Sequence, residues 1–198
     1  CLMVRKEDYA LSRGLDERFF AHMEEIDLCW RFRLEGKKVY TVPESLVYHI
    51  GGGTLPNDSP WKLKLNYRNN LLMLANNLAK TYSLKEAGKG EGTKAAAAAC
   101  SRASRVISMR MRLDRCSAMV YLLTGRFGCF KAVLGAHREY RSMVRLPDVE
   151  EVAAYAGGHR GDEGLIVAVS AQCRYRFFMH LRFHGFVSAP LRIVQLFF

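Results

Sequence analysis

Three acidic side chains stand close together where a helical pattern begins. Glu24, Glu25 and Asp27 come shortly after the aromatic pair 19–20, and apolar residues then recur at helical spacing as far as Gly36. A carboxylate in the first turn of a helix is kept ionised by the helix dipole and the free backbone amides, so it can accept a proton at neutral pH. Taken alone, however, the cluster is more typical of surface carboxylates that cap a helix.

A histidine and a run of glycines form a second group of candidates. His49 follows a predicted strand and comes shortly before Gly51, Gly52 and Gly53. A lone histidine is more often packed or hydrogen-bonded than a ligand, but at the end of a strand that opens onto a loop it has the exposure that a metal site needs. The glycines allow backbone amides to approach a phosphate closely, although the run without further context indicates only a flexible loop.

Charged residues on two predicted helices are candidates for binding substrate. Asp27 and Arg31 lie four residues apart on one helix face, where the alternative is a structural ion pair that fixes the helix. Arg68, followed by Asn69 and Asn70, lies in the predicted helix after Pro60. Contact of Arg68 with a donor phosphate or an acceptor sugar and a structural role on the helix surface are about equally expected.

The order of these motifs resembles that of family 2 glycosyltransferases, the inverting sugar transferases of bacterial cell-surface polysaccharide synthesis, and especially their rhamnosyltransferase-like branch. The typical form there is Gly-Phe-Asp-Glu-x-Phe-Phe, then Glu-Asp-x-Asp-Leu-Cys-x-Arg, then Val-Pro-Glu-Ser, then His-x-Gly-Gly-Gly-Thr. This chain reads GLDERFF, EEIDLCWR, VPES and HIGGGT in the same order. The resemblance extends from Cys1 to about Leu78, and an ordered set is far more specific than any single motif.

The resemblance implies roles for individual residues. The catalytic base of the family maps to Glu25, where this chain has glutamate in place of the commoner aspartate, and Glu24 would orient the acceptor. His49 would bind the catalytic divalent cation, Mg²⁺ or Mn²⁺, or the donor diphosphate. Most of the cation site in the family lies in an N-terminal nucleotide-binding half with an Asp-x-Asp motif, and no Asp-x-Asp occurs in this sequence. We therefore expect a fragment that transfers no sugar by itself.

The resemblance also implies an α/β fold, in which this chain supplies the C-terminal acceptor half of a GT-A-type domain followed by a mainly helical extension. Strands are expected at 2–5 and 39–42. The predicted domains are 1–82 for the acceptor-side half, 83–93 for a linker rich in Lys, Gly and Glu, and 94–198 for a basic, membrane-apposed extension.

The distribution of charge points to an anionic partner. The formal net charge is +11, from 30 Lys and Arg against 19 Asp and Glu, and the excess lies after residue 99. In the predicted helix 94–124 four arginines stand opposite four apolar residues: Arg102, Arg105, Arg112 and Arg115 against Val106, Met109, Leu113 and Val120. This pattern suits a helix that lies on an anionic membrane, and a core helix with a solvated charged face is about equally expected.

The remaining sequence signals indicate a reduced, non-spanning protein. The six cysteines are scattered without zinc-like spacing, which is typical of cytosolic thiols, and no apolar run approaches the roughly 20 residues of a membrane-spanning helix. The sequence thus predicts an inverting glycosyltransferase at the cytoplasmic face of the membrane. It would move a sugar, with rhamnose a candidate, from a nucleotide-sugar donor to a glycan or lipid-linked acceptor. The alternative is a non-catalytic basic module that binds anionic membrane or nucleic acid, but no recognised nucleic-acid motif accompanies the charge, so nucleic acid is not an expected partner.

Overall fold

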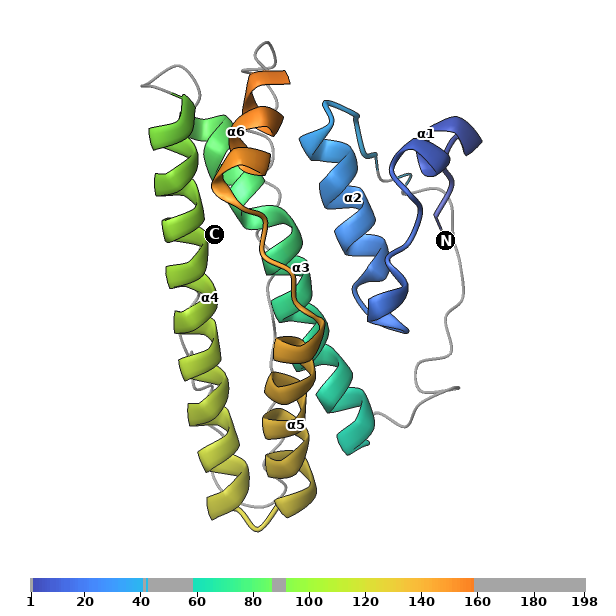
Figure 1. Ribbon diagram of the computed structural model, residues 1–198. Helices are drawn as coiled ribbons and strands as arrows, with labels where there is room; N and C mark the ends of the chain where they lie inside the picture. The colour runs from blue at the N-terminus through green and yellow to red at the C-terminus, as the bar shows by residue number, and fades with distance from the viewer. Residues whose placement is uncertain (1, 41, 43–58, 87–91, 159–198) are drawn as a thin grey trace.

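The computed structural model describes residues 2–40, 42, 59–86 and 92–158, and the regular structure in these ranges is helical throughout (Figure 1). The elements are α1 (Lys6–Leu11), the short 3₁₀ helix η1 (Glu17–Phe19), α2 (Glu24–Leu34), α3 (Pro60–Glu86), α4 (Gly92–Leu123), α5 (Phe127–Met143) and α6 (Val149–Gly158).

The predicted α/β, GT-A-type fold is wrong for these residues, because the described ranges contain no strand and no sheet. Residues 2–5, 39, 40 and 42, where strands were expected, have no regular structure. Met3 is 96% exposed and Tyr40 76% exposed, so these apolar side chains are not covered as they would be in a sheet. A strand is stable only when a neighbouring strand accepts and donates its backbone hydrogen bonds, and the described chain offers none.

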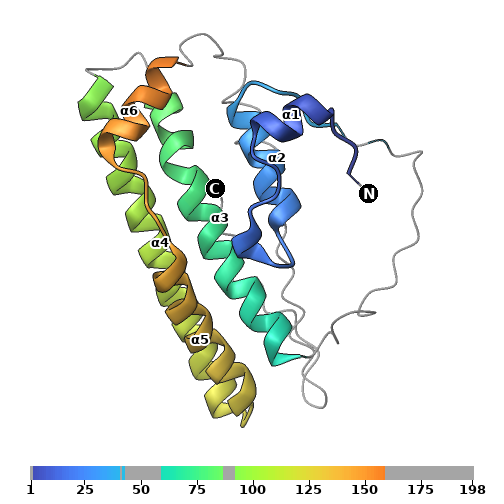
Figure 2. The same ribbon diagram turned by 45° about the vertical axis from the view of Figure 1, so that its right-hand side comes forward.

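Helix α3 is the centre of the molecule. α4 and α5 form an antiparallel hairpin that packs along it, α6 lies across α3 and α4 at one end, and α2 with η1 covers the other side (Figures 1 and 2). One core cluster joins all of these layers, because Phe19, Leu72, Ile107, Tyr140 and Val152 are buried in it together. The core therefore unites the motif region with the residues that follow it.

The predicted linker does not separate two cores. α3 continues to Glu86 with Ser83 and Leu84 buried, and α4 begins at Gly92. The alanines of α4, among them Ala96, Ala99 and Ala103, belong to the same core as α3. Small side chains let two helices approach closely, so α4, in the predicted extension, packs against α3, which begins in the predicted acceptor-side half.

The helices that the sequence predicts are otherwise confirmed. The pattern from Glu24 gives α2, the pattern after Pro60 gives α3, and the basic pattern over 94–124 gives α4. The break between α4 and α5 is at Gly125, whose φ of +73° is in the left-handed region that glycine adopts without strain. Asp16 caps η1, since its carboxylate accepts a hydrogen bond from the backbone N–H of Arg18 at 3.0 Å.

Two polar contacts hold α2 against the bundle, one from its side to α3 and one at its C-terminal end to α6. Trp30 donates its indole N–H to the hydroxyl of Thr81 on α3 at 3.0 Å. Tyr155 of α6 donates its hydroxyl to the carbonyl of Leu34 at 2.7 Å, which satisfies one of the free carbonyls at the end of α2. The position of α2, and hence of its acidic first turn, is set by both α3 and α6.

A carboxylate on α5 joins that helix to α3. Glu139 forms ion pairs with Lys64 and Arg68, the latter at 3.1 Å between Nη1 and Oε2. Burial raises the pKa of Glu139, but the hydrogen bonds and charges of the two cations outweigh burial and hold that pKa below its ordinary value. The carboxylate therefore stabilises the fold only while it is ionised.

The contribution of Glu139 to stability is expected to disappear in acid. Because its pKa in the folded state is lowered, the contribution is complete above the pKa of an unfolded glutamate, about 4.3, and is lost as the pH falls through the folded value. At pH 7 the variant Glu139→Gln should melt below the wild type, and the difference should shrink towards zero below pH 4. Thermal melts of both proteins at several pH values measure this. A difference that stays constant with pH would mean that Glu139 acts by packing.

Candidate functional site

The loop before α2 has an unusual backbone. Phe20, His22 and Met23 have φ angles of 62°, 72° and 73°, values that residues other than glycine seldom adopt. Such strain persists only where the surrounding structure holds it, and it is concentrated at functional sites. We define this segment, residues 20–23, as the strained loop.

Asn69 of α3 holds the strained loop in place. Its side-chain amide donates to the carbonyls of Phe19, Ala21 and His22 at 2.9, 2.7 and 2.8 Å. Asn69 is fully buried, so these hydrogen bonds form away from water, where an unpaired carbonyl would be costly.

Arg68 supports the same segment. It is 4% exposed, and its guanidinium donates to the carbonyls of Phe19 at 2.8 Å and Arg18 at 3.1 Å, to Asn69, and to Glu139. The structure thus places Arg68 beneath the loop with its donors turned to the protein. Of the two roles that the sequence left open, this arrangement corresponds to the structural one.

The two candidate catalytic carboxylates begin α2 directly after the strained loop. The residue before the helix, Met23, has no side-chain oxygen to accept from the first backbone amides, so the positive end of the helix is left to Glu24 and Glu25. Glu25 is exposed and can meet a ligand from solvent. The pKa of the Cys29 thiol, one turn along, is raised first by burial and then by the negative charge of Glu25.

Four polar atoms of the described residues are buried without a hydrogen-bond partner. They are Nε2 of His22 in the strained loop, Oε2 of Glu24 in the first turn of α2, and Oδ1 of both Asn70 and Asn77 on α3. Buried polar atoms are normally paired, so unpaired ones at a strained site indicate that a ligand or water completes them. The corner formed by the strained loop, Glu24, Glu25 and Asn70 is our candidate site.

Asp27 and Arg31 lie behind this site and form the ion pair that the sequence offered as the alternative to substrate binding. Asp27 is completely buried and accepts from Arg31 Nε at 2.8 Å and from Asn77 at 2.8 Å. The two ends of the Arg31 guanidinium donate to the carbonyls of Ser12 and Gly14. Both side chains are therefore occupied in joining α2 to α3 and to the segment after α1.

His49 and Gly51, Gly52 and Gly53, the predicted metal and phosphate contacts, lie outside the described residues. Within the described ranges there is no group of three or more His, Cys, Asp or Glu that could hold a metal ion. The described side chains thus do not form the expected Mg²⁺ or Mn²⁺ site, and we derive no chemical step through a cation.

His22 is the site residue that the sequence did not single out. Its motif position is unremarkable, and neither its left-handed backbone nor the burial of its Nε2 can be read from residue types. The only signal was its place immediately before the acidic cluster. Asn69 and Asn70 were noted beside Arg68, but adjacency could not tell which amide would hold the loop and which would be left unpaired.

Comparisons of the chain with protein-family models, with curated proteins and with solved structures find no match. The function is therefore argued from the residues of the candidate site.

Relieving the strain in the loop is expected to stabilise the protein. His22→Gly removes both a left-handed histidine, whose backbone costs roughly 1 kcal/mol or more, and an unpaired buried nitrogen. Urea unfolding should show a free energy of unfolding equal to or about 1 kcal/mol above that of the wild type, despite the lost side chain. The matched variant Phe19→Ala, which empties a fully buried position beside the loop, should instead cost about 3–5 kcal/mol. A loss in His22→Gly as large as that in Phe19→Ala would show that His22 is an ordinary packing residue.

Proposed function

We propose that this chain carries the acceptor-side acidic site of an inverting glycosyltransferase. The observation that carries the proposal is the position of two adjacent carboxylates, Glu24 and Glu25, at the start of α2. This helix has no side-chain cap and directly follows the strained loop. One oxygen of Glu24 is buried and unpaired. The ordered sequence motifs that resemble family 2 glycosyltransferases pass through the same corner.

In the proposed reaction Glu25 is the general base. Its carboxylate takes the proton of an acceptor hydroxyl, the hydroxyl oxygen forms a bond to the anomeric carbon of the donor sugar, and the bond from that carbon to the nucleoside diphosphate breaks with its electron pair on the leaving phosphate. Attack from the face opposite the leaving group inverts the anomeric configuration. Glu25 lies in the first turn of α2, at the positive end of the helix.

Glu24 has the complementary role of holding the acceptor. Its Oε2 is buried and unpaired, as is Oδ1 of Asn70, so both oxygens would accept hydrogen bonds from sugar hydroxyls only after the loop before α2 moves aside. A site built to pair with hydroxyls discriminates strongly against ligands that lack them, because its buried polar atoms would then stay unpaired.

The proposed partners are a nucleotide-sugar donor, with rhamnose a candidate sugar, and a glycan or lipid-linked acceptor in cell-surface polysaccharide synthesis. The proposed location is peripheral, on the cytoplasmic face of the membrane. Among the helices that the structure describes, none is long and apolar enough to cross a bilayer. His49 remains the candidate ligand for the donor diphosphate or its cation.

The test is an assay of the protein that carries these residues, expressed in full, against a panel of nucleotide sugars with membranes as the source of acceptor. Release of nucleoside diphosphate that depends on one donor and on membranes is the expected result, with a product whose anomeric configuration, read by NMR, is opposite to that of the donor. Residues 1–198 alone should release none. Retention of configuration, or no release with any donor, would contradict the proposal.

A further inference from the structure

The outward face of α4 carries an apolar stripe that no described element covers. Met109, Leu113, Cys116, Val120 and Leu123 recur at alternating steps of four and three, so they share one side of the helix. Their exposed fractions include 50% for Met109, 41% for Val120 and 81% for Leu123. We call these five residues the outer stripe. Part of it is the apolar face that the sequence predicts, but the face buried against α3 is a different one, built on alanines.

The outer stripe leads to the turn between α4 and α5. This turn lies at one end of the molecule, at the bottom of both ribbon views (Figures 1 and 2). Phe127 just beyond it is 59% exposed and Arg126 is exposed beside it. The end of the hairpin therefore presents large apolar side chains together with a positive charge.

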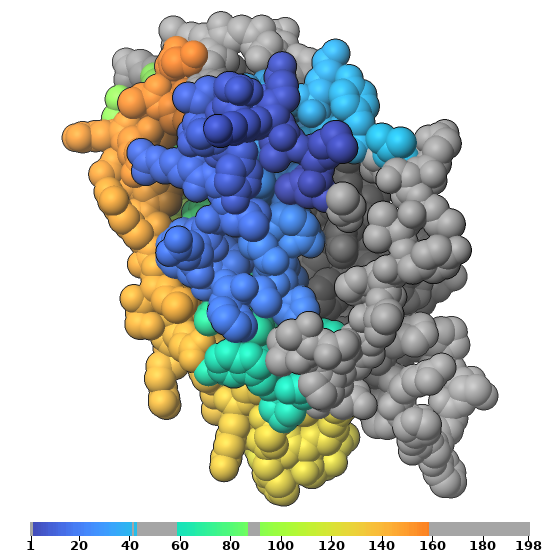
Figure 3. All heavy atoms as spheres, turned by 90° about the vertical axis from the view of Figure 1, so that its right-hand side faces the viewer, coloured from blue at the N-terminus to red at the C-terminus, as the bar shows by residue number. Residues whose placement is uncertain are grey.

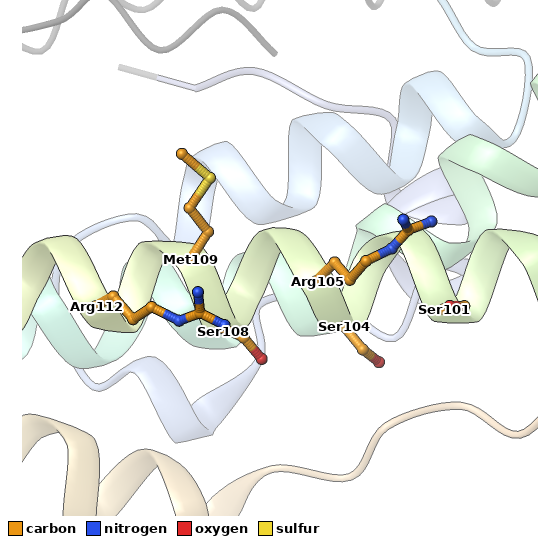
Figure 4. A pocket seen from close by; sticks show the side chains of 6 residues that line it. All are labelled: Ser101, Ser104, Arg105, Ser108, Met109 and Arg112. Atoms are coloured by element: carbon orange, nitrogen blue, oxygen red, sulfur yellow. The ribbon is translucent and has the colours of Figure 1, made fainter.

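Hydrogen-bond donors and positive charges flank the outer stripe. A shallow hollow on α4 is lined by Arg105, Arg112, Met109 and three serines: Ser101, Ser104 and Ser108. Figure 4 shows these side chains on the one helix, with Met109 directed to one side and Ser104 and Ser108 to the other. Arg115 is exposed one turn further on. Guanidinium and hydroxyl donors are the groups that bind phosphate oxygens.

No negative charge on the hairpin opposes these arginines. The only acidic residues between Gly92 and Met143 are Asp114 and Glu139. Asp114 is 2% exposed and bonded to Arg110 at 2.8 Å and to His137 at 3.2 Å, on the side of α4 that faces α5. Glu139 is paired with Lys64 and Arg68. The field over the outer stripe is therefore positive.

We propose that the outer stripe and the hairpin turn form a docking surface for an anionic phospholipid bilayer. The stripe would lie at the boundary of headgroups and acyl chains, with Arg105, Arg112 and Arg115 and the serines on the lipid phosphates. From Met109 to Leu123 the stripe is roughly 21 Å long at 1.5 Å per residue, so the helix lies in the plane of the membrane. The proposed docking surface gives the peripheral membrane location, which is part of the proposed function, a specific binding face. It does not depend on the sugar-transfer chemistry.

The positive charge beside the outer stripe favours an anionic membrane over a second copy of the chain as the partner that covers it. The spacing of the outer stripe would also suit a helix pair, but two such faces would bring their arginines together with no carboxylate to neutralise them. An anionic bilayer supplies the missing charge, and each basic side chain near it strengthens binding by about fivefold.

The experiment is cosedimentation of residues 1–198 with vesicles. Vesicles of phosphatidylglycerol and phosphatidylcholine in equal parts should bind the protein at low salt, pure phosphatidylcholine much less, and 0.5 M NaCl should release most of it. Leu113→Ser with Val120→Ser and Leu123→Ser should lower the partition coefficient at least about tenfold. Arg105→Gln with Arg112→Gln and Arg115→Gln should lower it about 100-fold.

Matched variants on the opposite side of the molecule serve as controls. Met3 and Leu11 are 96% and 77% exposed, so Met3→Ser with Leu11→Ser removes exposed apolar surface near α1. Lys6→Gln with Arg13→Gln and Lys38→Gln removes the same number of exposed charges. The apolar control should bind vesicles as the wild type does. The charge control should bind slightly less, because a lower net charge weakens the general attraction to the anionic surface.

Three results would overturn the inference. They are equal binding to neutral and anionic vesicles, equal losses in the α4 variants and their controls, and concentration-dependent dimerisation in gel filtration that the outer-stripe variant abolishes while vesicle binding is unchanged. The last would assign the stripe to a second copy. Because vesicle binding is read without any sugar donor, its failure would leave the proposed transferase reaction untouched.

Discussion

Glu25→Gln is expected to lower sugar transfer by about 10²–10⁴-fold in the protein that carries these residues, with donor binding nearly unchanged. Glutamine keeps the size of the side chain but cannot take the proton of the acceptor hydroxyl. Glu25 is exposed at the start of α2, so the substitution should leave the fold intact. The measurements are kcat and KM for transfer, with calorimetric binding of the nucleotide sugar.

The controls for Glu25 are two other glutamates. Glu17, exposed in η1, has no part in the proposed chemistry, so Glu17→Gln should transfer sugar at the normal rate. Glu24→Gln should raise the KM for the acceptor more than it lowers kcat, because Glu24 is proposed to hold that ligand. If Glu25→Gln turns over normally and Glu24→Gln does not, the base is Glu24. If both are normal, the acidic cluster only caps its helix.

Asp27→Ala is expected to cost about 3–5 kcal/mol of stability, as much as emptying the buried Phe19 position. The carboxylate is completely buried and accepts from Arg31, Asn76 and Asn77, so its removal takes one acceptor from each of these side chains and the counter-charge from Arg31. Urea unfolding monitored by circular dichroism measures the change. Because the same side chain positions α2, the variant should also have a more mobile first turn by hydrogen exchange at Glu24 and Glu25.

Two further variants separate the charge of Asp27 from its hydrogen bonds. Asp27→Asn keeps an acceptor oxygen but leaves Arg31 without a counter-charge, so its cost should fall below that of Asp27→Ala. Glu25→Ala removes a carboxylate from the exposed side of the same turn and should cost less than about 1 kcal/mol. Equal, small losses in Asp27→Ala and Glu25→Ala would show that the buried pair contributes little to folding.

Residue types and spacing predict only part of the acidic site. The first helical turn follows from spacing, and spacing offered the Asp27–Arg31 pair as one of two alternatives, since residues four apart share a helix face. The strained loop does not, because nothing in Phe20, His22 or Met23 favours a left-handed backbone. That conformation is imposed by Asn69 and Arg68 from α3, which are about 50 residues away along the chain.

The expected α/β fold was wrong because strands, unlike helices, cannot be predicted from one segment alone. Residues 2–5 and 39–42 have strand-like composition, but a strand forms only when another strand lies beside it, and this depends on the whole fold rather than on the segment. Helices close their hydrogen bonds within themselves, which is why α2, α4 and most of α3 were predicted, although α3 runs on to Glu86 into the predicted linker.

The sequence by itself determined that α3 follows Pro60, that a long helix begins near residue 94, and that this helix, α4, is basic with one apolar face. Only the tertiary structure decided which face is buried. Hydrophobicity favours the stripe with Met109, Leu113 and Val120, yet the buried side is the one with Ala99, Ala103 and Ile107. Close packing against α3 selects small side chains, and the buried Asp114 finds its partners on that same side in Arg110 and His137. The larger apolar residues are left facing outward because packing geometry, not hydrophobicity alone, sets the orientation of the helix.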